Sequence, residues 1–300
     1  MQYMNQENAT EQYLQQLRNM GFNEDMIEVY RKQMTQYVNM ANDWATQAQQ
    51  QNSDALHNFL NTDVDGQPEA FTIHLNAVSD LTYEEKWAIA CGADLAFANG
   101  QYLNDIATGL GKQACRQLLS DWWDIDSAEE LVETIEWLQE EGHRLQYDTI
   151  CQALNTISVK ESKTFLRSYA VNNEEEEEAV MEKLRNTRDA LELFREKQII
   201  GSTEQPDALI WDFARIINLC RGGFDAGYLP KQQALQYIVH CIPAIKSTYS
   251  SWKELSVAYQ FARCVWNGVD VDSVALFQEG MKTLLSSPES PWVALSWDAI

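Results

Sequence analysis

The chain has 300 residues, of which 45% are hydrophobic and ten are tryptophan, so it can bury a substantial core without disulfides or metal ions. Its formal net charge of -23 at pH 7 repels phosphate backbones, which makes nucleic acid an unfavourable partner and a basic protein a favourable one. A simpler interpretation is that the acidity only keeps the protein soluble. The sequence lacks an apolar run of about 18 residues and starts with a polar, glutamine-rich segment, so we expect a cytoplasmic protein without a membrane span.

Residues 1–76 are predicted to form an N-terminal helical extension. Glu24 to Gln49 carries an apolar stripe at helical spacing, and a shorter helix is expected at about Thr10 to Asn19. The stretch Gly66 to Asn76 contains FTIHL, the one credible strand pattern of the chain. Because one short strand cannot form a sheet domain, the expected fold class is all-α.

Residues 77–300 are predicted to form a compact multi-helix domain, which brings the whole chain to about a dozen helices. Thr82-x-x-Glu85 and Ser127-x-x-Glu130 are capping-box patterns, in which a hydroxyl and a carboxylate each accept a free backbone N–H at the start of a helix. They predict helix starts at both places.

A highly charged helix at about residues 165–200 is expected to interrupt this domain. Its acidic run Glu174 to Glu178 is followed by mixed charges and a narrow apolar seam. Five adjacent carboxylates cannot be buried without partners, so we expect the run to be exposed and dispensable for stability.

The stretch from Trp211 to Trp266 has the clearest helix punctuation. Gly227 is the kind of residue that ends a helix in the left-handed conformation, and Pro230 suits the start of the next one. A third helix follows, and its helical wheel places Arg263 among aromatic residues. The pattern predicts three successive helices, of which the first and the third carry arginine.

Several tryptophans share helix faces with apolar residues, and we expect them to be largely buried: Trp87, Trp211, Trp252 and Trp266. The irregular C-terminal tail SSPESPWVALSWDAI is expected to dock Trp292 and Trp297 on the core.

The polar residues of these helices form the candidate site: Asp212, Arg215, Asn218, Arg221, Asp225 and Arg263, with His143 and Arg144 after the helix that Gly142 ends. One interpretation is an ion-pair network in which Asp212 or Asp225 accepts hydrogen bonds from an arginine of the third helix. The other is an arginine-lined pocket for an anion, walled by tryptophans 211, 252 and 266. Unpaired buried arginines are costly, so pairing is expected.

His143 and Arg144 have two interpretations of their own. They can interact favourably with the C-terminal end of the preceding helix, whose dipole attracts positive charge. Alternatively, His143 can act as a general base beside Asp124 or Asp126. Capping is the expected role.

No local motif for metal or cofactor chemistry is found. The four histidines lie in separate segments without an HExxH pair, and the glycine-rich GLGK follows a probable helix rather than a strand. The six cysteines are scattered singly among apolar neighbours and are expected to be reduced core residues. We therefore expect no metal and no cofactor, and the sequence identifies no catalytic residue.

Several blocks occur in a specific order: EEKWAIACGADLAFANG, SDWWDIDSAEELVETIEWLQEEGHR, IWDFARIINLCRGGFDAGYL, SSWKELSVAYQFARCVWNG and SPW. Together they resemble the bacterial domain-of-unknown-function 1266 family between about Leu81 and Trp292. The resemblance implies emphasis on positions such as Trp123, His143 and Asp212, and it implies no activity.

Two functions from different classes remain open. The first is a non-catalytic cytoplasmic protein-interaction protein, of the adaptor or immunity kind, with an acidic surface for a basic partner. The alternative is an enzyme or small-anion binder that uses a pocket of arginine, tryptophan and histidine. An open cleft containing Arg215, Arg263 and His143 would favour the second, and fully paired side chains would favour the first.

Overall fold

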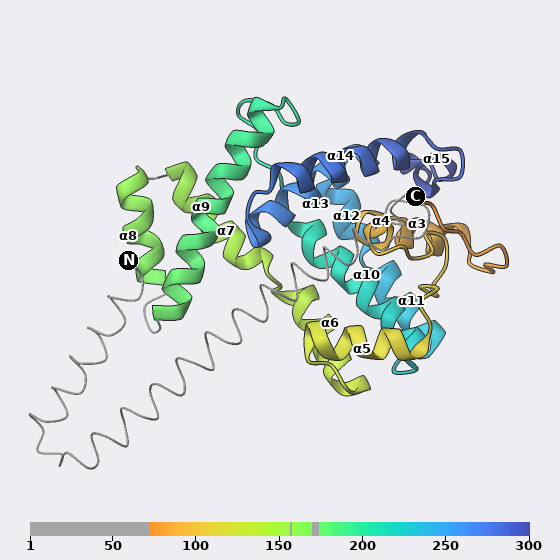
Figure 1. Cartoon of the computed structure of the whole chain (residues 1–300). Helices are drawn as coiled ribbons and strands as arrows, with labels where there is room; N and C mark the ends of the chain where they lie inside the picture. Colours follow the sequence, from red (N-terminus) through yellow and green to blue (C-terminus); the bar gives the residue numbers. More distant parts are fainter. Residues whose placement is uncertain (1–71, 157, 170–173) are drawn as a thin grey trace, which may run out of the picture. The chain divides into compact units, whose positions relative to one another are not determined.

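A computed structural model describes residues 72–156, 158–169 and 174–300 of the chain (Figure 1). These residues form helices α3 to α15 and one short 3-10 helix, which confirms the all-α class. Their only β-type pairing is an isolated parallel bridge between His74 and Tyr102, so the FTIHL stretch adds no sheet. The helices predicted before residue 50 lie outside the described residues, as does almost all of the predicted extension.

The capping patterns start helices as expected. At α3 (Tyr83–Ala90), Thr82 Oγ1 accepts the Glu85 N–H at 3.3 Å and Glu85 Oε2 accepts the Thr82 N–H at 2.8 Å. At α6 (Ala128–Glu140), Ser127 Oγ accepts the Glu130 N–H at 3.2 Å. The Glu130 carboxylate reaches one residue further back and accepts the Asp126 N–H at 2.8 Å.

Helix α10 (Leu209–Ala226) packs against several other helices and thereby positions the polar residues of interest (Figure 1). Its neighbours include α4 (Ala93–Ala98), α5 (Lys112–Trp123), α6, α11 (Lys231–His240), α12 (Ile242–Thr248) and α13 (Trp252–Asn267). Gly223 allows α6 to approach, because a Cβ there would lie 2.2 Å from Leu131 Cδ2. Gly227 ends α10 in the left-handed conformation at φ 80°, as predicted.

The charged stretch expected as one helix is two helices, α8 (Val159–Tyr169) and α9 (Glu174–Glu196). With α7 (Arg144–Thr156) they enclose a small second core of Ile150, Ala153, Leu166, Val180 and Leu184. Helix α9 also packs along α13, so its apolar seam faces protein on two sides. Glu178 is exposed and Glu177 forms a surface ion pair with Arg167 at 2.8 Å, while the side chains of residues 174–176 lie outside the description.

Three of the four core tryptophans are buried as predicted, namely Trp87, Trp211 and Trp252. Trp266 is only partly buried, because it lies at the end of α13 next to the exposed Asn267. Its ring still packs against those of Trp211 and Tyr147, at centroid distances of 5.4 and 6.1 Å, and Trp266 is less buried than the other three.

The C-terminal tail docks on the core as expected, after α14 (Val271–Ser286) and through α15 (Pro291–Ala294) and the 3-10 helix Trp297–Ala299. The Trp292 ring stacks on Trp252 at 5.8 Å, and its Nε1 donates to the Ala90 carbonyl at 2.8 Å. Trp297 lies 5.1 Å from the Trp87 ring centroid.

All six cysteines are free, and each is buried except the half-buried Cys151. Among the described helices, none is both long and apolar enough to cross a membrane.

Candidate functional site

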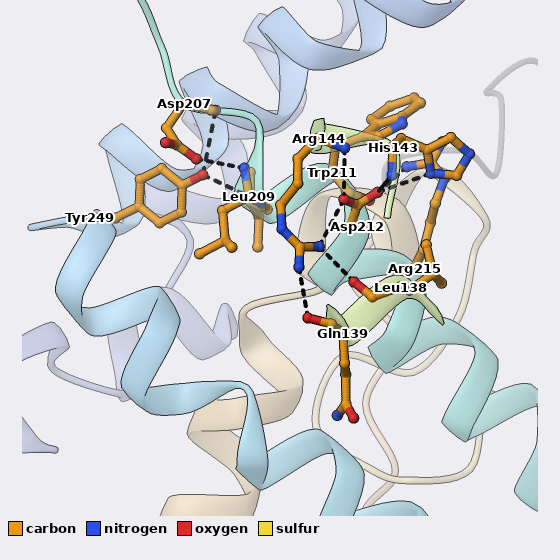
Figure 2. A network of polar contacts seen from close by, with 11 residues as sticks. Leu138, Gln139, His143, Arg144, Asp207, Leu209, Trp211, Asp212, Arg215 and Tyr249 are labelled. Atoms are coloured by element: carbon orange, nitrogen blue, oxygen red, sulfur yellow. Dashed lines mark hydrogen bonds and ion pairs between the residues drawn. The ribbon is translucent and has the colours of Figure 1, made fainter. Parts of the chain in front are cut away.

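Asp212 is the centre of a buried hydrogen-bond network in the first turn of α10 (Figure 2). Its side chain is completely buried. Oδ1 accepts the backbone N–H of His143 at 3.0 Å and its ring Nδ1–H at 2.9 Å. Oδ2 accepts the backbone N–H of Arg144 at 3.0 Å and Nη1–H at 3.1 Å. One carboxylate thus fixes the junction between α6 and α7 to the start of α10.

Arg144 also caps α6, as its position in the sequence predicted. Nη1 and Nη2 donate to the carbonyls of Leu138 and Gln139, each at 2.6 Å, which satisfies acceptors that the end of a helix leaves free. Gly142 makes the turn at φ 61°, and a Cβ there would lie 2.2 Å from Asp212 Oδ2. The turn therefore requires glycine for its conformation and for the approach of the carboxylate.

His143 pairs with a different carboxylate from those that sequence spacing suggested. Its partner is Asp212 rather than Asp124 or Asp126, because the left-handed turn after α6 directs the ring towards α10. The side chain is 30% exposed, and its ring contacts Trp137 and Trp266 edge-on at centroid distances of 5.0 and 6.0 Å.

Arg221 and Asp225 form a separate cluster at the other end of α10, where both hold the loop that joins α4 to α5. The Arg221 guanidinium is buried and donates to four oxygens of that loop, those of Gln101, Tyr102, Asp105 and Ala107. Asp225 Oδ2 accepts the N–H and the hydroxyl of Thr108 at 2.8 and 2.6 Å. Burial lowers the pKa of Arg221 to about 10, which still leaves it charged at neutral pH. These two residues stabilise a loop.

Arg263 forms no ion pair with Asp212 or Asp225, so that prediction is wrong. Both aspartates are already occupied by donors from other segments. The Arg263 guanidinium lies over the Phe277 ring, 4.7 Å from its centroid, with Nη2 3.5 Å from Ser273 Oγ. The arginine that does pair with one of these aspartates is Arg144 of α7, whose Nη1 lies 3.1 Å from Asp212 Oδ2.

Arg215 lies on the Trp211 indole, with Cζ 3.2 Å from the ring centroid and Nη1 donating to the Trp211 carbonyl at 2.8 Å. Trp211 in turn stacks on Trp266 at 5.4 Å. Trp252 belongs to the cluster around Trp87 and the C-terminal tail, so it is not a third wall beside the arginines. The arginine and tryptophan group is therefore smaller than predicted. Asn218 follows one turn later on α10, and its Oδ1 is buried without a hydrogen-bond partner among the residues that the structure describes.

A second surface, not identified as a site from the sequence, lies where α5 leads into α6. Trp122 is 57% exposed and Trp137 is 41% exposed. Beside the Trp137 ring is a depression of about 340 Å³, lined by Trp123, Asp124, Ile125, Glu130, Glu133, Thr134 and Trp137. We call these lining residues the acidic aromatic face.

The sequence signal for the acidic aromatic face is the run LLSDWWDIDSAEELVETIEWLQEEG, residues 118–142. It contains nine aspartate and glutamate residues and no lysine, arginine or histidine. A one-sided charge composition with three tryptophans indicates a surface feature, but only the fold shows which rings are exposed. In residues 72–300, apart from the undescribed gaps, no three histidine, cysteine or carboxylate side chains converge as a metal site would require.

Comparison with known proteins places this structure in a family. No curated protein and no solved structure matches the chain. The model of the family described as "Protein of unknown function (DUF1266)" matches residues 118–297, which is more than half of the sequence and includes the acidic aromatic face, the Asp212 network and both arginine-bearing helices. The chain belongs to the DUF1266 family.

Proposed function

We propose that the protein is a non-catalytic cytoplasmic interaction protein, of the adaptor or immunity kind, whose acidic aromatic face binds a basic segment of a partner protein. One observation carries this proposal: the exposed Trp137 ring and the partly buried Trp123 ring line a depression whose ionisable lining residues are all carboxylates.

The chemistry of this face matches arginine and lysine. A guanidinium can stack on the Trp137 ring, where cation–π contact contributes about 0.5–1 kcal/mol at an exposed site. Carboxylates at Asp124, Glu130 and Glu133 can accept its N–H groups. Glu130 is held in place by the Asp126 N–H, and this bond is the first cause that lowers its pKa, so it stays charged at neutral pH.

The roles of the other polar residues support a non-catalytic function. Asp212, Arg144 and Arg221 direct their hydrogen bonds to backbone groups and to one another, which is what a fold requires of buried charges. Such residues stabilise the scaffold that presents the acidic aromatic face.

The test is a calorimetric titration of the full chain with an octaarginine peptide at low and high salt. Glu133→Gln with Glu136→Gln removes two exposed charges from α6, each worth roughly 0.5 kcal/mol to a basic ligand, so the dissociation constant should rise about fivefold. Trp137→Leu alone should raise the dissociation constant twofold to fivefold relative to the wild type, because roughly 0.5–1 kcal/mol of binding free energy is lost with the ring. Salt should weaken binding to the wild type.

The matched control is Glu192→Gln with Glu196→Gln, which removes the same charge from exposed positions on α9. It should bind almost like the wild type. Equal weakening by the two double variants, together with no effect of Trp137→Leu, would show that the peptide responds to net charge alone and would refute the proposal.

A further inference from the structure

Polar and aromatic residues form one stripe along α10 and another along α13, and the two stripes meet between these helices. Each stripe has an arginine in its middle. Residues spaced four and three apart lie on one face of a helix. The α10 stripe is Trp211, Arg215 and Asn218, and the α13 stripe is Tyr259, Arg263 and Trp266. The Trp211 ring joins the stripes, because its centroid lies 5.7 Å from that of Tyr259 and 5.4 Å from that of Trp266. Arg263 lies between these two residues on α13, and Arg215 lies on the Trp211 ring itself.

Both guanidinium groups retain free donors. Arg215 uses Nη1 for the Trp211 carbonyl, and Arg263 has one long contact from Nη2 to Ser273. Within the described part of the chain, neither guanidinium forms an ion pair with a carboxylate. Each of the two arginine residues is partly exposed.

A buried donor without an acceptor lies on the same stripe. Trp211 is 2% exposed, and its Nε1–H has no hydrogen-bond partner among the described residues. Buried polar groups in folded proteins are nearly always paired, and leaving one unpaired costs stability. An acceptor supplied by a ligand would satisfy it.

The two positive charges act on the same neighbourhood. Burial raises the pKa of Tyr259, and the charges of Arg215 and Arg263 both lower it. Burial also lowers the pKa of Arg215 to about 10; Tyr259 and the Asp212 carboxylate raise it by less than burial lowers it, and the charge of Arg263 lowers it by a smaller amount still. Two cations that repel each other beside an unpaired N–H donor form a region complementary to an anion.

We propose that a small oxyanion of the phosphate type binds between α10 and α13 and accepts hydrogen bonds from Arg215, Arg263 and Trp211 Nε1. Two guanidinium groups match the charge of a phosphate dianion and can each donate in a bidentate manner. This site is independent of the acidic aromatic face, which lies on α5 and α6 and would bind cations.

The experiment measures phosphate binding to the full chain by calorimetry and by thermal melting, with chloride at the same ionic strength as the reference. Phosphate should raise the melting temperature of the wild type. Arg215→Gln and Arg263→Gln should each weaken binding about tenfold, the loss expected for one charge-assisted interaction. Arg185→Gln changes an exposed arginine on α9 and should bind like the wild type.

Arg215→Lys keeps the charge but removes the planar fork, so it should retain part of the affinity even if Arg215→Gln perturbs folding. Phenyl phosphate distinguishes the source of the ligand: tighter binding than inorganic phosphate indicates a phosphate monoester, and equal binding indicates the free ion. No phosphate response in the wild type, or equal affinity in the wild type and the folded Arg263→Gln variant, would overturn the proposal. Octaarginine binding should be unchanged in Arg263→Gln, so the two sites are tested separately.

Discussion

Asp212→Asn should destabilise the protein strongly, because this carboxylate accepts four hydrogen bonds while completely buried. An amide can accept at only one of its two atoms, so its NH₂ group would face the donors of either His143 or Arg144. Breaking a buried charged pair of this kind typically costs roughly 3–5 kcal/mol. For a domain of this size that corresponds to a fall in melting temperature of roughly 10 °C.

The assay is urea unfolding followed by circular dichroism, with thermal melting as a second measurement. Asp189→Asn is the control, since Asp189 is exposed on α9, and it should stay within about 0.5 kcal/mol of the wild type. If Asp212→Asn unfolds at the same urea concentration as the control, Asp212 does not hold α6 and α7 to α10, and the structural role assigned to it is wrong.

Three further predictions concern stability. Burial raises the pKa of Asp94 from 3.8 to about 7, so the folded protein keeps a proton that the unfolded chain releases. The free energy of unfolding should therefore fall by up to about 4 kcal/mol as the pH rises from about 4 through 7. Asp94→Asn should flatten this dependence in urea titrations between pH 5 and 8, and an unchanged slope would exclude Asp94 as its source. Gly142→Ala should lower the melting temperature, because a Cβ would meet Asp212 and the turn has a positive φ; a melt like that of the wild type would contradict this geometry. Trp87→Ala should cost roughly 3–5 kcal/mol and Trp122→Ala less than about 0.5 kcal/mol by chemical denaturation, and similar losses would show that their exposure is misassigned.

Local signals in the sequence predicted much of the fold. Thr82 and Ser127 start helices because their hydroxyls accept backbone N–H groups three residues later, an interaction that depends only on neighbouring residues. Gly227 ends α10 for the same local reason. The division of the charged stretch into α8 and α9 was missed, because the second core that packs these two helices together is formed by contacts between three helices.

The candidate site shows where local patterns stop being sufficient. The capping role of Arg144 was predictable, since it follows directly after the helix that it caps. The lack of an aspartate partner for Arg263 was not predictable. Asp212 is occupied by His143 and Arg144, which lie 69 and 68 positions before it in the chain. Trp122, exposed on α5, could not be distinguished from core tryptophans by residue type, since exposure depends on which helices pack over a ring.

The most direct test of the proposed interaction is site-specific photo-crosslinking from the depression of the acidic aromatic face. A photoreactive phenylalanine analogue at Thr134, which lines the depression, would be compared with the same analogue at Glu192 on α9, each mixed with octaarginine in low salt. We predict a cross-link to the peptide from position 134 that high salt suppresses and that Trp137→Leu reduces, with little from position 192. Equal cross-linking from both positions, or none from position 134, would contradict the assignment of this face as the binding surface.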